Sequence, residues 1–164
     1  PGALPGALPG ALPGSGLALR PPAAVLATVS VYADEGLLTP EGFRDVALMG
    51  FPPDQGTGGP GTVRIAAHES LVAAIRGLVD ASGPVATVST CSGTDALAEG
   101  VRARTGALAE AMEGASVGFT AARLAPGLPF AEVRVISNST GDRAAQQWDL
   151  AGALERLARL ASSL

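Results

Sequence analysis

Polar side chains of two kinds lie close together in residues 111–143, within a stretch that is otherwise apolar. Glu113 occurs among alanine and glycine residues that predict a closely packed helix. Arg134, Ser137 and Asn138 lie along or just after a run of Val, Ile and Phe that predicts a buried strand. A carboxylate accepts hydrogen bonds from hydroxyl groups, whereas an amide both donates and accepts. Because open α/β sheets bind ligands at one end of their strands, we expect these groups to meet there and to form a ligand site.

Glu113 needs partners if it is buried, since an unpaired buried carboxylate costs several kcal/mol. One interpretation is an ion pair with Arg134, or exposure at a helix end. The other is a ligand, because one carboxylate can accept hydrogen bonds from two neighbouring sugar hydroxyls. Arg134 itself lies between Val133 and Val135, so we expect its guanidinium to orient or neutralise Glu113.

Asn138 belongs to a Ser-Asn-Ser-Thr-Gly run directly after the predicted strand. Such a run is also typical of a turn, which is the structural alternative. A 6-oxopurine presents acceptors at N7 and O6, and the amide NH2 of Asn138 can donate to either. An aspartate at this position would instead favour a 6-aminopurine. The amide therefore favours hypoxanthine or guanine over adenine.

Three other residues are candidates for chemistry, and each has a simpler interpretation. Cys91 follows a predicted strand without an evident base partner, so a small buried thiol is the preferred interpretation. His68 has no Cys, His or Asp cluster around it, so we expect neither a metal site nor a cofactor. Trp148 could stack on a base, although the start of a helix favours a packing role. The glycines of residues 50–61 lack the Lys-Ser/Thr of a phosphate loop and predict a disordered surface loop.

The spacing of apolar residues predicts the elements that carry these side chains. Strands are expected at 25–32, 84–90 and 129–137, and helices at 69–80, 94–104, 109–124 and 145–162. This order predicts an α/β layered domain. The strand at 129–137 should run parallel to the previous one through a right-handed crossover, and helix 109–124 should be buried on nearly all sides. Residues 33–43 predict a loop.

Composition limits the class of protein. The 164 residues suit one domain, and we expect residues 1–20, with three PGAL repeats, to form a low-complexity lead to a domain at 21–164. Proline at every fourth position should exclude this lead from helix interiors and sheet ladders. The net charge of −4 argues against nucleic-acid binding, and no apolar stretch approaches the roughly 20 residues of a membrane span. A single cysteine fits a reducing cytoplasm.

Three segments resemble the nucleoside phosphorylase/nucleosidase superfamily: TVSTCSGT at 87–94, AEAMEGASV at 109–117 and VRVISNSTGDRAAQQW at 133–148. Met-Glu before small residues, then Pro-Phe and Arg-x-Ile-Ser, resembles the pattern of the purine nucleosidases. The Ser-Asn that follows, with Gly-Asp-Arg and a tryptophan, resembles the futalosine hydrolase branch, as does DEGLLTPEGF at 34–43. Methylthioadenosine/S-adenosylhomocysteine nucleosidases usually have aspartate in place of that asparagine. The resemblance implies a three-layer α/β fold, with a central mixed sheet flanked by helices and incomplete at its N-terminus.

The resemblance also implies roles for individual residues. Glu113 and Asn138 would be the catalytic pair, the first at the ribose hydroxyls and the second at the base. The other substrate-binding residues would be Met112 under the sugar, Ser137 beside Asn138, Arg134 as an orienting group, and Thr90 and Cys91 near the base. The reaction implied is hydrolysis of the N-ribosidic bond of futalosine, which releases hypoxanthine and leaves dehypoxanthine futalosine for menaquinone biosynthesis. A homo-oligomer is implied as well.

The start of the chain departs from this family pattern. Members begin with a strand, a Gly-rich turn and further strands that supply the water-activating acid and much of the ribose pocket, where this sequence has the PGAL repeat. The general base is therefore unassigned, with Asp34 and Glu35 candidates only by default. Three alternatives stay open: a methylthioadenosine/S-adenosylhomocysteine-type nucleosidase, a purine nucleoside phosphorylase, which would need a phosphate site, and an inactive fragment that only binds purine or supports an oligomer.

Overall fold

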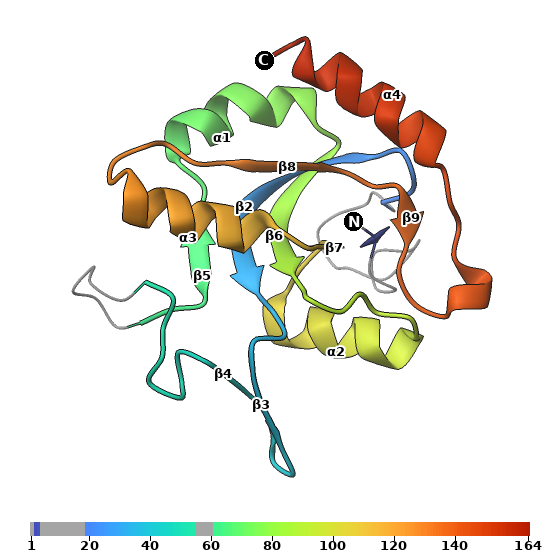
Figure 1. Ribbon diagram of the computed structural model, residues 1–164. Helices are drawn as coiled ribbons and strands as arrows, with labels where there is room; N and C mark the ends of the chain where they lie inside the picture. Colours follow the sequence, from blue (N-terminus) through green and yellow to red (C-terminus); the bar gives the residue numbers. More distant parts are fainter. Residues whose placement is uncertain (1, 4–18, 55–60) are drawn as a thin grey trace.

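The structure, a computed structural model, describes residues 2–3, 19–54 and 61–164. Within these residues a seven-stranded mixed sheet forms the centre, with helices packed around it (Figure 1). The strands of the sheet are β1 (Gly2–Ala3), β2 (Ala24–Tyr32), β5 (Arg64–Ala66), β6 (Ala81–Thr87), β7 (Ala109–Ala111), β8 (Glu132–Val135) and β9 (Asn138–Ser139). The helices are α1 (Glu69–Ile75), α2 (Asp95–Thr105), α3 (Gly114–Leu124) and α4 (Leu150–Ala161). The predicted architecture, a mixed sheet flanked by helices, is confirmed.

Strand β2 is the strand around which the sheet is built. One of its edges pairs in parallel with β6 over almost its whole length. Its other edge is shared by two short strands, since β8 pairs antiparallel with its first half and β5 antiparallel with its second half. The apolar residues 24–27 are completely buried, as expected of a strand covered on both faces. The strand predicted at 25–32 is therefore confirmed.

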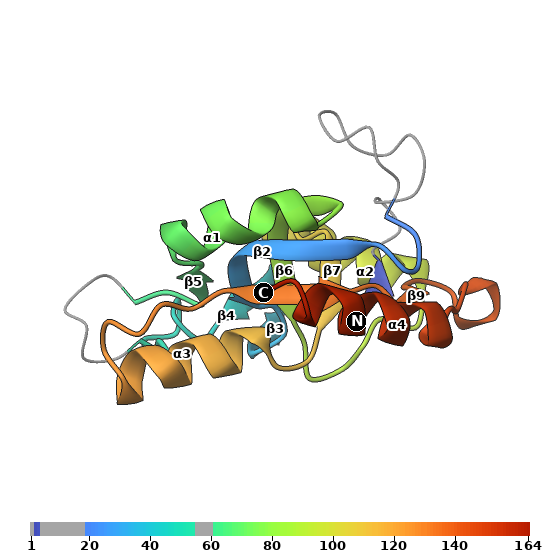
Figure 2. The ribbon, with the colours of Figure 1, turned by 90° about the horizontal axis from the view of Figure 1, so that it is seen from above.

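The helices cover both faces of the sheet, with α1 on one side and α3 on the other (Figure 2). Helix α3 packs against β2 and β6, α2 against β6, and α4 against β8. Tyr32 at the end of β2 holds α3 in place, because its hydroxyl donates to Ser116 Oγ at 3.0 Å and its ring stacks on Phe119 at 5.6 Å between centroids. Leu19, which lies inside the predicted lead of residues 1–20, joins Val25 in the apolar core.

Helix α2 has the ends that its sequence predicts. The side chain of Thr94 accepts a hydrogen bond from the backbone N–H of Leu97, and so caps the first turn. Gly106 ends the helix with φ of 71°, a left-handed conformation that favours glycine. The helix predicted at 94–104 is thus confirmed to within a residue.

Three predictions about the middle of the chain are wrong. Residues 33–43 contain no simple loop but most of a hairpin, in which β3 (Gly36–Thr39) pairs antiparallel with β4 (Gly42–Asp45). The helix predicted at 109–124 is divided, because 109–111 pair in parallel with β6 as β7 before α3 begins. Alanine and glutamate favour helix, but pairing with a buried strand overrides this local preference. Helix α3 is also not buried all round, since Val117 and Leu124 are exposed.

The predicted parallel strand at 129–137 is wrong in direction and in length. Strand β8 covers only four of these residues and runs antiparallel to β2. It pairs with the first half of the edge whose second half pairs with β5, and an antiparallel strand needs no right-handed crossover. The short strands β5 and β9 have no clear signal in the sequence. Helix α1 is shorter than predicted and continues as a 3₁₀ turn at Arg76–Leu78.

The beginning of the chain is described only at Gly2–Ala3, which lie between β7 and β9 in the sheet. The expectation that the PGAL lead takes no part in a sheet ladder is wrong at these two residues, because the repeat leaves three non-proline residues between prolines. The rest of the lead up to residue 18 and most of the predicted loop, residues 55–60, lie outside the described part. The division at residue 20 stays a prediction. Within the described part of the chain, no helix combines the length and apolar character that a membrane span needs.

Candidate functional site

Glu113 occupies the turn between β7 and α3. It is the N-cap residue of α3 rather than a residue inside a helix, and its side chain is largely exposed. The first turn of α3 is fastened to the sheet, because Thr87 Oγ1 at the end of β6 accepts a hydrogen bond from the backbone N–H of Ala115 at 2.8 Å. The premise of a buried Glu113 is therefore wrong, but its backbone is held firmly at one end of the sheet.

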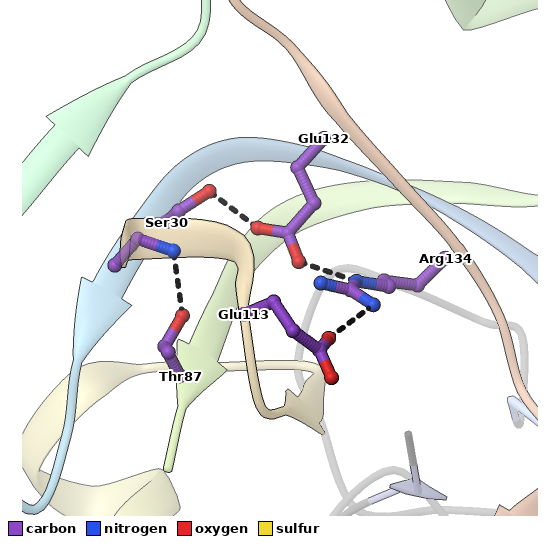
Figure 3. A network of polar contacts seen from close by, with 6 residues as sticks. Ser30, Thr87, Glu113, Glu132 and Arg134 are labelled. Atoms are coloured by element: carbon purple, nitrogen blue, oxygen red, sulfur yellow. Dashed lines mark hydrogen bonds and ion pairs between the residues drawn. The ribbon is translucent and has the colours of Figure 1, made fainter. Parts of the chain in front are cut away.

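Arg134 connects this turn to β8. Its Nη1 lies 2.8 Å from Glu113 Oε2, which confirms the predicted ion pair (Figure 3). Its Nε donates to Glu132 Oε1 at 2.6 Å, so one guanidinium bridges two carboxylates. Sequence reasoning missed Glu132, although a glutamate inside an apolar strand is the signal that could have found it.

A cavity of about 400 Å³ lies where β9 meets the loops after β6 and before α4. Its lining consists of Cys91, Ser92, Gly93, Ser137, Asn138, Thr140, Arg143, Gln146 and Trp148. It therefore brings together three of the predicted site residues: Cys91, Ser137 and Asn138. The volume falls in the range of small-molecule sites.

The amide of Asn138 is oriented by its neighbours. Ser137 Oγ donates to its Oδ1 at 3.0 Å, and its Nδ2 donates to the carbonyl of Ser139 at 2.9 Å. Trp148 pairs with Asn138 through an isolated backbone bridge and is half-exposed, with the guanidinium of Arg143 4.9 Å from its ring centroid. The expected packing role of Trp148 is therefore wrong, because the ring lies beside the cavity and an arginine covers it.

Four predicted residues lie outside the lining of this cavity. Glu113 and Arg134 form the separate pair described above, and Met112 beside them is half-exposed. Thr90 is exposed, and its backbone N–H donates to Asp34 Oδ2 at 3.0 Å. Carboxylate and amide thus come from neighbouring parts of the sheet, since β1 lies between β7 and β9, but they do not line one cavity.

The two walls of the cavity are joined by three hydrogen bonds. The backbone N–H of Arg143 donates to the carbonyl of Gly93 at 3.2 Å. Asp95 and Asp142 exchange hydrogen bonds, each backbone N–H donating to the other's carboxylate at 3.2 and 3.0 Å. These contacts fix the loop after β6 against the loop after β9, which predicts a largely preformed cavity.

Glu110 holds the cavity loop from below. It is buried in β7, and it accepts hydrogen bonds from the backbone N–H of Ser92 at 2.9 Å and from Ser92 Oγ at 2.6 Å. Removal of a donor to a buried carboxylate lowers the stability of the folded protein, because water cannot reach the carboxylate to replace the lost hydrogen bond. Sequence reasoning missed Glu110 because alternation of alanine and glutamate gave no strand signal.

Ser92→Ala is expected to lower the free energy of unfolding by about 1–2 kcal/mol, since Glu110 would keep only the backbone donor. Urea denaturation measures the change. Ser89→Ala is the matched control: Ser89 is exposed, and its backbone N–H to Asp34 is kept. Equal stability of the two variants would contradict the role of the Ser92 hydroxyl.

Cys91 and His68 show no catalytic arrangement. Cys91 is exposed rather than buried, which corrects the expectation, and the residues that line its cavity include no histidine. His68 caps α1, with Nδ1 2.8 Å from Ser70 Oγ. Across the described residues, no three His, Cys, Asp or Glu side chains gather as a metal site requires.

Comparisons of sequence find two similar proteins, both with the same name. The protein from Acidothermus cellulolyticus named futalosine hydrolase is 40% identical over 128 residues, which are 76% of this chain and 50% of that protein. A futalosine hydrolase from Streptomyces coelicolor is 40% identical over 135 residues, which are 81% of this chain and 53% of that protein. The chain therefore spans about half the length of the curated relatives it matches.

Solved structures show the same fold at lower identity. An S-adenosylhomocysteine nucleosidase from Streptococcus pyogenes has a TM-score of 0.64 and 20% identity, covering 88% of this chain and 60% of that one. A futalosine hydrolase mutant from Helicobacter pylori has a TM-score of 0.57 and 19% identity, covering 89% and 60%. The family model described as phosphorylase superfamily matches residues 14–164. Since this match includes nearly all of the chain, the protein belongs to the phosphorylase superfamily.

Proposed function

We propose that this protein hydrolyses the N-ribosidic bond of a 6-oxopurine nucleoside, with futalosine as substrate and hypoxanthine as the released base. The 40% identity to two proteins named futalosine hydrolase carries this proposal. The asparagine in the cavity of about 400 Å³ supports it, because its amide suits a 6-oxo base.

Asn138 would bind the base. An amide NH2 has two hydrogens, and one already donates to the carbonyl of Ser139. The second can donate to N7 or O6 of a 6-oxopurine, with Ser137 holding the amide in orientation. The leaving base gains electron density during cleavage, so this hydrogen bond strengthens in the transition state and lowers the barrier. Trp148 and Cys91, which line the cavity, would lie around the base, with Thr90 as the residue before Cys91 in the same loop.

Glu113 would bind the ribose. Its carboxylate has room for further donors after the bond to Arg134, because two oxygens offer about four acceptor sites. Two ribose hydroxyls can therefore donate to it, with Met112 beneath the sugar. Its negative charge also favours the oxocarbenium-like sugar of the transition state. Glu113 and Asn138 are in this proposal the catalytic pair; since they do not line one cavity, the nucleoside would extend from the cavity, with its base at Asn138, to Glu113 at the start of α3.

Release of hypoxanthine from futalosine, in phosphate-free buffer and again with phosphate added, tests the proposal. Release without phosphate is the expected result. Release that requires phosphate would make the protein a phosphorylase instead. Release of adenine from methylthioadenosine alone would favour the other nucleosidase branch, and binding of hypoxanthine without turnover would leave only a purine-binding role.

Asn138→Asp is expected to shift base preference from hypoxanthine towards adenine by about tenfold, because one neutral hydrogen bond contributes roughly 1–1.5 kcal/mol. The measurement is the ratio of kcat/KM for inosine to that for adenosine. Asn138→Ala is the control, since it removes the contact to both bases and should lower both values without reversing the preference. An unchanged ratio in the aspartate variant would show that Asn138 does not read the base.

The proposal also includes the fate of the product, the location of the protein and its oligomeric state. Dehypoxanthine futalosine would leave the site for menaquinone biosynthesis, in a cytoplasmic protein that forms a homo-oligomer. The single cysteine supports a reducing location. Analytical ultracentrifugation of the purified protein measures its mass in solution and so tests the oligomeric state.

A further inference from the structure

Glu132 is a buried carboxylate for which the proposed reaction has no direct use. Its side chain is only 4% exposed, although charged groups are almost never buried so fully unless they are paired. Desolvation of a carboxylate costs several kcal/mol, which must be offset by good partners. The partners of Glu132 therefore indicate what this residue does.

Its two oxygens are held by different elements. Ser30 Oγ in β2 donates to Oε2, and Arg134 Nε in β8 donates to Oε1 at 2.6 Å (Figure 3). Glu132 and Arg134 are two residues apart on one strand, so their side chains leave the same face of the sheet. The carboxylate is fixed by β2 and in turn fixes the guanidinium.

These contacts form a series that leads from the interior to the surface. The side-chain exposures are 4% for Glu132, 20% for Arg134 and 62% for Glu113. An exposed ion pair is usually mobile and contributes only about 0–1 kcal/mol, because both side chains lose freedom when they pair. Here the arginine is already immobilised from its buried side, so little further freedom is lost when it holds Glu113.

Gly114 allows this arrangement. A Cβ at this first residue of α3 would overlap the carboxylate of Glu132. The carboxylate therefore lies directly against the backbone that follows Glu113, and it touches both the arginine and the start of the helix. Glu132 therefore reaches the surroundings of Glu113 in two ways, through the side chain of Arg134 and at the backbone of Gly114.

We propose that Glu132 is a positioning residue, which fixes Arg134 and, through it, sets the carboxylate of Glu113 towards the ribose. The ribose part of this inference rests on the proposed function, whereas the hold of Glu132 on Arg134 does not. Glu132 itself touches no substrate. Its removal should therefore affect recognition of the sugar hydroxyls and leave recognition of the base unchanged.

The test compares Glu132→Gln, which keeps the shape of the side chain, with Glu99→Gln as the matched control. Glu99 pairs with Arg102 on the surface of α2, away from the site. The first readout is the hydrogen exchange rate of the Arg134 Nε–H group, measured by NMR. Loss of the charged acceptor should speed this exchange at least about tenfold, the equivalent of roughly 1.4 kcal/mol, and the control should not.

The second readout is the affinity for three probes: inosine, 2′,3′-dideoxyinosine and hypoxanthine. The wild type should bind inosine at least about tenfold more tightly than the dideoxy compound, because hydrogen bonds to a charged group contribute roughly 1.5–3 kcal/mol. In Glu132→Gln this ratio should fall to that of Glu113→Gln, while the affinity for hypoxanthine is kept.

Each outcome decides the inference. If Glu132→Gln keeps the wild-type ratio of affinities for inosine and 2′,3′-dideoxyinosine, the inference is overturned and the proposed function is left intact. If the variant binds all three probes more weakly by the same factor, Glu132 has a merely structural role, which also overturns the inference. If the wild type does not distinguish the two nucleosides, the ribose assignment of the proposed function fails. The Arg134 exchange rate then decides alone: faster exchange supports the hold of Glu132 on Arg134, and unchanged exchange refutes it.

Discussion

Glu113→Gln is expected to slow the release of hypoxanthine from futalosine by at least about 10²-fold. Two hydrogen bonds from ribose hydroxyls to a charged acceptor contribute roughly 1.5–3 kcal/mol each, and about 1.4 kcal/mol corresponds to a factor of ten in rate. The amide also removes the negative charge beside the oxocarbenium-like sugar. Initial rates measured at saturating and at low substrate separate the effect on kcat from that on KM.

This loss should occur without unfolding. Glu113 is 62% exposed, so loss of its ion pair with Arg134 should change stability by less than about 1 kcal/mol. Glu155→Gln is the matched control, because Glu155 also pairs with an arginine, Arg159, on the exposed face of α4. Wild-type rates in the Glu113 variant would remove this residue from the ribose site.

Gly114→Ala is expected to lower the free energy of unfolding by about 3 kcal/mol. The new Cβ would overlap the carboxylate of Glu132, which must then leave Ser30 or Arg134. Breaking a buried ion pair costs about 3–5 kcal/mol. The higher helix propensity of alanine returns up to about 1 kcal/mol of this loss. Urea denaturation, followed by circular dichroism, measures the difference.

Gly100→Ala provides the control for this experiment. Gly100 lies in α2, and a Cβ there would meet only Arg104 Nη1, at 3.4 Å, which is an ordinary contact distance. The same exchange should therefore stabilise the protein by about 0.5–1 kcal/mol. A Gly114 variant as stable as the Gly100 variant would show that the carboxylate of Glu132 can move aside at no cost.

Local signals predict the parts of the fold in which local forces dominate. Thr94 and Gly106 give the ends of α2 because capping depends on a few adjacent residues. The β-branched residues of β2 predict a strand, and the structure buries it at the centre. The predicted pair of Glu113 and Arg134 also forms, since a charged residue between two apolar ones needs a partner.

Contacts between distant residues explain what the sequence could not show. The segment 109–111 has the composition of a helix and becomes a strand because β6 offers it hydrogen-bonding groups. The position of β8 beside the first half of β2 depends on β5, which pairs with the second half of the same edge. The glutamate inside the apolar segment of β8 is visible in the sequence, but its approach to Gly114 is a contact between different elements that no local pattern shows.

The sequence predicts several residues of the candidate site but not how these residues are arranged in space. Asn138, Ser137 and Cys91 do line one cavity. Glu113 lies apart from it, because β1 is inserted between β7 and β9. The position of Trp148 near the start of a predicted helix favoured a packing role. Its ring instead lies beside the cavity under Arg143, and this contact depends on the turn between the two residues.

The way in which β2 is paired has a consequence for synthesis on the ribosome. Ala24 in β2 pairs with Val135 in β8. After the ribosome has added Ala24, it must therefore add about 110 more residues before Val135 exists. At roughly 5–20 residues per second, this takes about 5–20 s. During that time one edge of the most apolar strand has no final partner for its first half. Aggregation of nascent chains should therefore depend on translation speed between β2 and β8, even when the finished protein is stable.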